Sequence, residues 1–291
     1  MTRLVKRFLL LLFLIGAAAS SAAAEVVRGG NTDGPAIVFL PGLASHGELW
    51  GPWVETYQNS HRTYLLTAPG FAGVPPRLGD GTYLASLVAE VTSALRSDGV
   101  EKATIVGHSM GGLVALMLGI DAPELVGRLL IVDTAPYLGA LFMPGMTPEM
   151  VARQAGQMAQ QMTSMPRMAF DAQQRMGLQR LVLKTEFLPT LEAWSAASDQ
   201  ATIALAFKEV LSTDYRSRLA DIKAPAVILA AHNAMMPFSQ DQLAATYRAQ
   251  YGALERADIR IVPNSAHFIM IDQPDVFSIA LAETLEEGNT Q

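Results

Sequence analysis

The sequence predicts an α/β fold, in which a mostly parallel β-sheet is covered by helices on both faces and carries an inserted helical cap. Two observations support this prediction. Short runs of Val, Ile and Leu alternate with longer helical stretches along most of the chain, which is typical of a parallel sheet buried on both faces. The alternation stops between residues 139 and 217, where eight of the 14 Met residues lie and no strand-like run occurs. We therefore expect residues 25–138 and 218–291 to form the core and residues 139–217 to form the cap.

Six apolar runs are expected to form the strands of the core: residues 36–40, 63–66, 103–106, 129–132, 226–231 and 259–262. Four stretches with a helical pattern are expected to form its helices: residues 84–97, 113–120, 240–251 and 275–285. The stretch 113–120 is almost wholly apolar, so we expect a buried helix there. Asp272 and Pro274 are expected to set the start of the last helix.

The cap is expected to be helical. Met158, Met162 and Met165 share one helix face by their spacing. Such a face is more typical of adaptable packing than of a binding surface. Its functional alternative is a pliable apolar lid over an acyl or ring-shaped group.

The composition excludes several classes of protein. The 291 residues are 50% hydrophobic and 16% charged, which is too apolar for a disordered chain. The absence of Cys excludes a disulfide scaffold, a thiolate metal site and a Cys nucleophile. The net charge of −6 and the lack of a basic cluster past residue 10 argue against nucleic acid as a partner. No His, Asp or Glu pair has metal-ligand spacing, so we expect a small-molecule substrate and neither metal nor cofactor.

The N-terminus has the three parts of a secretory signal peptide. Arg3, Lys6 and Arg7 precede an apolar run at residues 8–19, and small residues follow as far as Ala24. A membrane-spanning helix needs about 20 apolar residues, so this run is too short for an anchor. We expect residues 1–24 to be removed and the mature chain to be exported, to the periplasm or beyond, without a membrane span.

The segment GHSMG at residues 107–111 is the strongest chemical signal in the sequence. It follows an apolar strand and opens a buried helix, which is the context of a nucleophile elbow. Ser109 would lie in a strained turn with its hydroxyl exposed, and side chains at Gly107 and Gly111 would clash there. A phosphate-binding loop is disfavoured because the Lys and the glycine spacing are missing. We therefore predict that Ser109 is a catalytic nucleophile.

A serine hydroxyl needs a base to remove its proton. The candidate bases are His46, His61, His108, His232 and His267. The first two precede the elbow, whereas the expected order is Ser, acid, His. His108 adjoins Ser109, but we expect its ring to point elsewhere on the tight turn. His267 lies in the loop after the last strand, from which a base can reach Ser109, so we predict His267 as the base and treat His232 as its rival.

With these motifs the chain resembles the α/β-hydrolase superfamily over residues 27–285. The supporting segments are LPGLASHGELW (40–50), APGFAG (68–73), GHSMGG (107–112), LLIVDTAP (129–136) and NSAHFIMIDQP (264–274). Within the superfamily, the chain is similar to secreted, capped, esterase-like members. The resemblance implies an oxyanion hole formed by the backbone N–H groups of Leu43 and Met110. Most members begin the first of these loops with His-Gly, and the Pro-Gly of this chain is compatible with the same backbone geometry.

The acid of the catalytic triad is where the chain departs from the family pattern. Its usual place is the loop after strand 226–231, but the segment HNAMMP found there contains no carboxylate. Some members place the acid after the strand that follows the nucleophile helix, where this chain has Asp133. We predict Asp133 as the acid, although an Asp at a strand end often only ties down a loop. Asp199 and Asn233 are weaker candidates, and a dyad without an acid stays open.

These residues predict a serine hydrolase that cleaves an apolar carboxylic ester or lactone through an acyl-enzyme. An aminopeptidase-like amidase would use the same triad, but the cap has no acidic cluster to hold a substrate amine. A cofactor-free haloperoxidase-like enzyme also shares the triad. The missing acid after strand 226–231 motivates a hypothesis from another class, a hydrolase-fold binding or sensor protein with little turnover.

Overall fold

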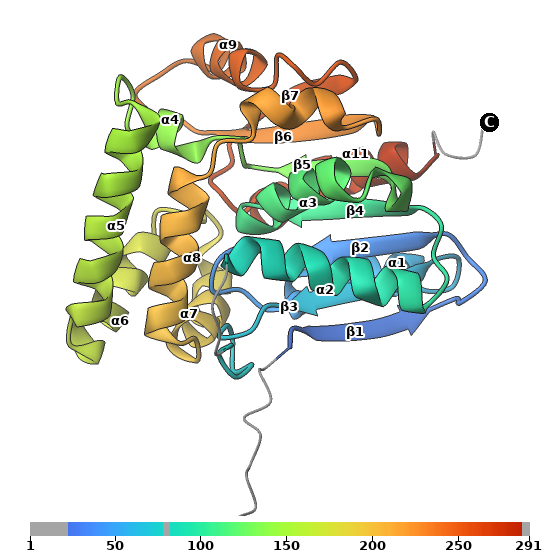
Figure 1. The fold of residues 1–291 in the computed structure, drawn as a ribbon, viewed down its shortest axis with the longest axis horizontal. Helices are drawn as coiled ribbons and strands as arrows, with labels where there is room; N and C mark the ends of the chain where they lie inside the picture. The colour runs from blue at the N-terminus through green and yellow to red at the C-terminus, as the bar shows by residue number, and fades with distance from the viewer. Residues whose placement is uncertain (1–22, 78–81, 287–291) are drawn as a thin grey trace, which may run out of the picture.

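The computed structural model describes residues 23–77 and 82–286, and within these ranges the chain forms a seven-stranded sheet flanked by helices (Figure 1). The strands are β1 (Glu25–Gly30), β2 (Ala36–Leu40), β3 (Arg62–Thr67), β4 (Ala103–His108), β5 (Val126–Val132), β6 (Ala226–His232) and β7 (Ala257–Pro263). Their order across the sheet is β1-β3-β2-β4-β5-β6-β7. β1 is antiparallel to β3, and all other neighbouring pairs are parallel. The predicted mostly parallel sheet is therefore confirmed.

Helices cover both faces of the sheet. The core helices are α1 (Gly51–Tyr57), α2 (Tyr83–Ser97), α3 (Met110–Asp121), α9 (Gln240–Gln250), α10 (Ile269–Asp272) and α11 (Pro274–Glu286). Alternate residues of a strand face opposite sides of the sheet, and in β2 Val38 and Leu40 join one buried cluster while Ile37 and Phe39 join the other. Residues of α2, α3 and α9 complete the first cluster, and residues of α1 and α11 complete the second. Both faces are thus buried, as the continuous apolar runs predicted.

Two tryptophans anchor the segment after β2. Trp50 is fully buried and Trp53 nearly so. Their ring centres lie 5.6 Å and 4.6 Å from that of Phe277 in α11. This packing holds the segment that follows the loop at residues 41–46 against the face of the sheet that α1 and α11 cover.

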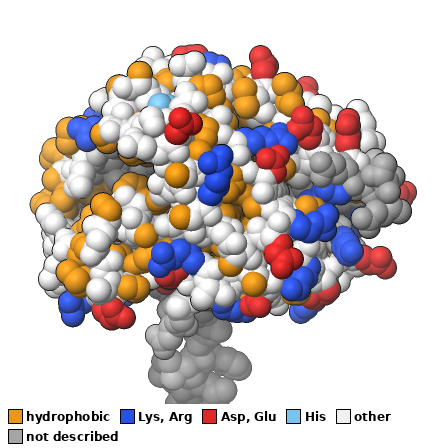
Figure 2. All heavy atoms as spheres, turned by 90° about the horizontal axis from the view of Figure 1, so that it is seen from above, with side chains coloured by type: hydrophobic (Ala, Val, Ile, Leu, Met, Phe, Trp, Pro, Cys, Tyr) orange, Lys and Arg blue, Asp and Glu red, His pale blue; other side chains and the backbone are white. Residues whose placement is uncertain are grey.

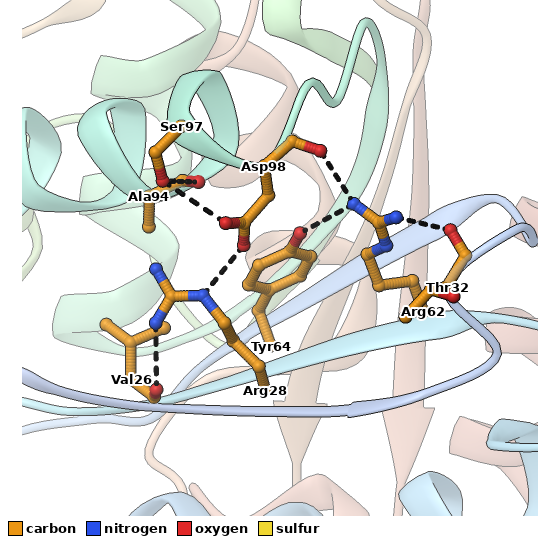
Figure 3. A network of polar contacts seen from close by, with 8 residues as sticks. All are labelled: Val26, Arg28, Thr32, Arg62, Tyr64, Ala94, Ser97 and Asp98. Carbon is orange, nitrogen blue, oxygen red and sulfur yellow. Dashed lines mark hydrogen bonds and ion pairs between the residues drawn. The ribbon is translucent and has the colours of Figure 1, made fainter.

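β1 was not predicted from the sequence, because its residues are exposed apart from the partly buried Val26. Polar contacts attach this edge strand to its neighbours (Figure 3). Arg28 of β1 forms an ion pair with Asp98 at 2.7 Å, and Arg62 of β3 donates to the backbone oxygen of Asp98 at 2.8 Å. The hydrogen bond from Arg28 lowers the pKa of the Asp98 carboxyl. Asp98 therefore ties β1 and β3 to the end of α2.

Residues 139–217 contain helices and no strand. Their main helices are α4 (Leu138–Phe142), α5 (Pro148–Ser164), α6 (Arg167–Leu178), α7 (Leu188–Ala196) and α8 (Gln200–Ser212). In Figure 1 these helices stand together at the end toward which the parallel strands point, with α5 packed along α8. Figure 2 shows hydrophobic side chains gathered on the left, where the cap lies, and most charged side chains of that face further right. Of the exposed large hydrophobic side chains in the described ranges, more than half belong to the cap, Phe142, Met168 and Met176 among them.

The predicted signal peptide, residues 1–24, lies outside the described residues except for Ala23 and Ala24. β1 begins at Glu25, the residue after the predicted cleavage site. In the two described ranges, no helix has both the length and the hydrophobicity needed to cross a bilayer.

Candidate active site

Ser109 lies in the turn between β4 and α3, at the carboxyl edge of the sheet. Its backbone angles are φ 54° and ψ −120°, a strained conformation for a residue with a side chain. Two hydrogen bonds hold the turn: the Ser109 N–H donates to Val132 O at 2.9 Å, and Ser109 O accepts from the Leu113 N–H at 3.1 Å. The strand, sharp turn and buried helix are those expected from the GHSMG motif.

The turn can close around Ser109 because three nearby glycines have no Cβ atom. A Cβ on Gly107 would lie 2.4 Å from Gly111 O, and a Cβ on Gly111 would lie 2.2 Å from Leu40 O. Both distances are far shorter than van der Waals contact, so the two glycines are required on steric grounds. A Cβ on Gly42 would lie 3.1 Å from Ser109 Cβ. The loop after β2 therefore passes close beside the serine.

This loop brings Leu43 to the cavity that Ser109 and Met110 also line. Met110 is the first residue of α3, so its N–H has no acceptor within the helix. Neither the Leu43 N–H nor the Met110 N–H donates a hydrogen bond within the described part of the chain. The two residues expected to supply the oxyanion hole thus both line the cavity with Ser109, and their N–H groups remain available as donors.

Asp133 and His267 lie 134 positions apart in the sequence and are in contact in the structure. Asp133 directly follows β5, and His267 lies in the loop at residues 264–268, between β7 and α10. The Nδ1 atom of His267 lies 2.6 Å from Oδ2 of Asp133. The other carboxylate oxygen, Oδ1, accepts the N–H of Ala231 from β6 at 2.8 Å. Because His267 and Ser109 line one cavity, the structure places all three predicted residues at a single site.

The rival candidates have other partners. His232 Nε2 lies 2.9 Å from Phe238 O. Asp199 caps α8 by accepting the Thr202 N–H, and Asn233 donates to a backbone oxygen of the His267 loop. His232 is absent from the cavity lining, whereas His267 is part of it. Of the three candidate acids, only Asp133 is hydrogen-bonded to the His267 side chain among the described residues, so the geometry singles out His267 and Asp133.

His108 has a position that the sequence did not predict. It is fully buried, lines the cavity, and its ring centre lies 4.5 Å from that of His267. Its Nε2 lies 3.1 Å from the backbone oxygen of His267. A carbonyl oxygen can only accept, so we assign the proton of His108 to Nε2. Burial and the neighbouring His267 hold the pKa of His108 well below its ordinary value, so this neutral ring supports the backbone of His267.

The cavity beside Ser109 has a volume of about 390 Å³, which is in the range of small-molecule sites. The methionine face of α5 and its end, Met158, Met162 and Met165, lines it together with Phe207 of α8. None of the described residues in its lining is Asp, Glu, Lys or Arg. In the described ranges, no group of three or more His, Asp and Glu side chains could hold a metal ion. The cavity is therefore suited to an uncharged, largely apolar molecule.

Comparison with known proteins extends these findings. The sequence pattern of the "Alpha/beta hydrolase family" matches residues 37–280. Among curated proteins, the chain is 30% identical over 101 residues to the "Putative carbamate hydrolase RutD" of Shigella flexneri serotype X (strain 2002017). This match covers 35% of the chain and 38% of that protein, so the chain matches little more than a third of the length of this relative.

Solved structures match almost the whole chain. The enol-lactonase from Burkholderia xenovorans LB400 matches with a TM-score of 0.72 and 19% identity, over 90% of this chain and 96% of that chain. A thermophilic esterase from Thermogutta terrifontis matches with a TM-score of 0.74 and 17% identity, over 92% and 94% of the two chains. At these identities the likeness concerns the fold.

Proposed function

Because this chain belongs to the alpha/beta hydrolase family, we propose that it is a serine hydrolase of uncharged, apolar carboxylic esters or lactones. The observation that carries the proposal is the 2.6 Å contact between His267 Nδ1 and Asp133 Oδ2, with His267 and Ser109 lining one cavity. A nucleophile, a base and a group that orients the base are the parts that acyl transfer requires.

In the proposed reaction, the hydroxyl oxygen of Ser109 attacks the substrate carbonyl carbon while Nε2 of His267 takes the hydroxyl proton. Asp133 keeps a proton on Nδ1 and stabilises the imidazolium that forms. The N–H groups of Leu43 and Met110 stabilise the oxyanion of the tetrahedral intermediate. His267 then gives its proton to the leaving alcohol. In the second half-reaction it activates the water that hydrolyses the acyl-enzyme.

The lining of the cavity supports the substrate class. A charged group buried there would have no oppositely charged partner among the described lining residues, and an unpaired buried charge is costly. Apolar side chains such as Met162 and Phe207 would bury an acyl chain or ring. The solved structures of similar fold include an esterase and an enol-lactonase. The relative named as a carbamate hydrolase adds carbamates to the compounds worth testing.

The alternative functions receive less support from the site. An aminopeptidase-like amidase would need a carboxylate near the cavity to hold a substrate amine, and the described lining residues include none. The hypothesis of a binding or sensor protein with little turnover was motivated by a missing triad acid. The contact between Asp133 and His267 removes that motive. No observation favours a haloperoxidase-like reaction over ester hydrolysis.

The proposal is tested with a fluorophosphonate probe and with p-nitrophenyl esters of butyrate and octanoate. We expect the probe to label Ser109 and both esters to be hydrolysed. Ser109→Ala should abolish labelling and lower kcat by about 10⁴-fold or more, because the nucleophile is lost. Ser195→Ala is the matched control, since Ser195 also lines the cavity and should not matter for labelling.

Absence of both labelling and hydrolysis in the wild-type protein would contradict the proposal and favour a binding protein. A parallel panel of a lactone, a carbamate and an aminoacyl p-nitroanilide separates the remaining alternatives. We expect kcat/KM to be highest for the neutral ester or lactone. Faster cleavage of the aminoacyl anilide would favour the amidase.

We also propose that the chain is exported, on the basis of its N-terminal sequence. Expression of the full chain in a bacterial host, followed by fractionation and mass spectrometry, tests this. A mature N-terminus at Glu25 in the periplasm or medium is expected, and an intact Met1 in the cytoplasm would refute the proposal.

A further inference from the structure

Asp272 is a buried carboxylate that the proposed reaction does not use. It ends α10 and is only 5% exposed. Its partners in the described ranges are three backbone N–H groups: Oδ1 accepts from Leu183 at 2.8 Å and from Lys184 at 3.0 Å, and Oδ2 accepts from Ala266 at 2.8 Å. The sequence suggested that Asp272 sets the start of the last helix. The expectation for Pro274 is confirmed, because α11 begins there, but the expectation for Asp272 is wrong, because its carboxylate bonds two other segments of the chain.

These bonds join the cap to the loop that carries His267. The two N–H groups bound by Oδ1 belong to the segment between α6 and α7, whereas Ala266 directly precedes His267. A further bond joins the same two segments on the other side of His267, where the Phe268 N–H donates to Leu181 O at 3.1 Å. His267 is therefore held between two links to the cap.

Only a carboxylate can form all three bonds of Asp272. Burial of a charge is costly, and charge-assisted bonds from the three N–H groups offset that cost. An amide side chain offers one acceptor oxygen and turns an NH2 group toward the remaining partner. Because Oδ1 serves two N–H groups and Oδ2 serves one, the oxygen of an Asn would face the cap. Its NH2 group would then face the N–H of Ala266, next to His267.

We propose that Asp272 is a positioning residue, which sets the ring of His267 against Asp133 and Ser109 by tying its loop to the cap. This inference rests on the proposed function, in which His267 is the base. The cap segment involved also contacts the substrate cavity, because Leu181 is part of its lining. A displacement of about 1 Å at a catalytic group can cost about 100-fold in rate, so a broken link at Ala266 should slow the reaction without removing any reacting atom.

The test compares Asp272→Asn with the wild-type protein. We expect kcat for p-nitrophenyl butyrate to fall about 10- to 100-fold, while KM changes by less than about threefold. The pH at which kcat/KM is half-maximal should also shift, because the contact between His267 and Asp133 is altered. By proton NMR, the low-field signal of the His267 Nδ1 proton should move or broaden in the variant.

Asp199→Asn is the matched control. Asp199 also accepts a backbone N–H, that of Thr202, but it lies in the cap and the partners of its carboxylate among the described residues are both groups of Thr202. We expect this variant to keep the wild-type kcat, pH profile and low-field signal. If Asp272→Asn does not fold, Lys184→Pro replaces it, because the φ of −79° at Lys184 suits proline and the change removes one donor to Oδ1. We expect a smaller fall in kcat, about threefold, with the same shift of the low-field signal.

A low-field signal and pH profile that match those of the wild type, in a folded Asp272→Asn or Lys184→Pro protein, would overturn the inference. Such a result would leave Asp272 as a stabilising residue only. The NMR measurement needs no turnover, so it separates this inference from the proposed function. If the wild-type protein neither reacts with the probe nor hydrolyses esters, the proposed function fails, whereas the effect of Asp272 on the His267 signal is still decided.

Discussion

The core and the cap differ in where their backbone is strained and how deeply their helices are buried. In α3 of the core, every residue from Met110 to Ile120 is buried. In α5 of the cap, only Val151, Ala155 and Ala159 are buried. The described non-glycine residues with positive φ are Ala44, Ala72, Ser109, Asp133 and Asn264. Each of them follows the carboxyl end of a core strand, and none lies in the cap.

The two regions therefore divide the proposed function between them. Strained conformations persist only where the surrounding structure holds them in place, and the buried core does this for Ser109 and Asp133. The cap contributes apolar, partly exposed side chains to the cavity. Changes in the core should therefore alter the rate of the chemical step or the stability, whereas changes in the cap side chains that line the cavity should alter binding.

Asp133→Asn should have the largest effect. Oδ1 of Asp133 accepts the N–H of Ala231, so the oxygen of an Asn would take that place and its NH2 group would face Nδ1 of His267. The ring would then carry its proton on Nε2 and could not accept the proton of Ser109. We expect kcat to fall about 10⁴-fold with little change in the free energy of unfolding, and full retained activity would refute the role of Asp133.

The second prediction compares one glycine of the core with one of the cap. Gly111→Ala places a Cβ 2.2 Å from Leu40 O, so we expect a loss of about 3 kcal/mol or more in the free energy of unfolding. Gly156→Ala, inside α5, meets no atom within 4 Å and should stabilise the protein by about 0.5–1 kcal/mol. Chemical denaturation measures both. Equal changes in the free energy of unfolding at the two positions would contradict the predicted difference between core and cap.

The third prediction concerns pH and the buried His108. Its pKa in the folded protein lies well below the ordinary value, which is about 6.5 in an unfolded chain. Between these two values the unfolded state binds more protons, so the free energy of unfolding should fall as the pH drops below about 6.5. The slope from this one group is at most about 1.4 kcal/mol per pH unit. Its contribution is fully present above about pH 7.5.

His108→Gln tests whether His108 causes this pH dependence. A Gln does not titrate but can still donate to the backbone oxygen of His267. Denaturation curves between pH 5 and 8 should show a flatter slope in the variant. His61→Gln is the comparison variant at the opposite end of the core. Burial also lowers the pKa of His61, but that ring is only partly buried, so its removal should flatten the slope less. An unchanged slope in His108→Gln would contradict the assignment.

The smallest effect is expected in the cap. Met162→Ala shortens a side chain that lines the cavity, and each buried CH₂ contributes about 0.8 kcal/mol. We expect KM for p-nitrophenyl octanoate to rise about fivefold with kcat unchanged, and no change for a short ester such as the acetate. Met168→Ala is the control, because Met168 is 83% exposed and absent from the lining. A fivefold fall in kcat of Met162→Ala would contradict the prediction that this part of the cap acts on binding alone.

Local sequence signals predicted part of this molecule well. The six apolar runs and the GHSMG motif lie within single stretches of chain, so periodicity and turn chemistry were sufficient for the parallel strands and for the turn at Ser109. β1 was missed because an exposed edge strand has no apolar run, and its attachment through Asp98 depends on α2, about 70 residues further along. The positions of His108 and Asp272 depend on partners 159 and up to 89 residues away. No local pattern could reveal either contact.

The methionine face also makes the protein sensitive to oxidants. Peroxide converts a flexible apolar thioether into a polar sulfoxide, and the chain has no cysteine that could react first. Met158, Met162 and Met165 are partly exposed in the cavity wall, whereas a serine, a histidine and an aspartate are far less easily oxidised. Mild oxidation should therefore weaken the binding of long apolar acyl groups and spare the turnover of short esters. Enzymatic reduction of the sulfoxides should restore the binding of the long acyl groups.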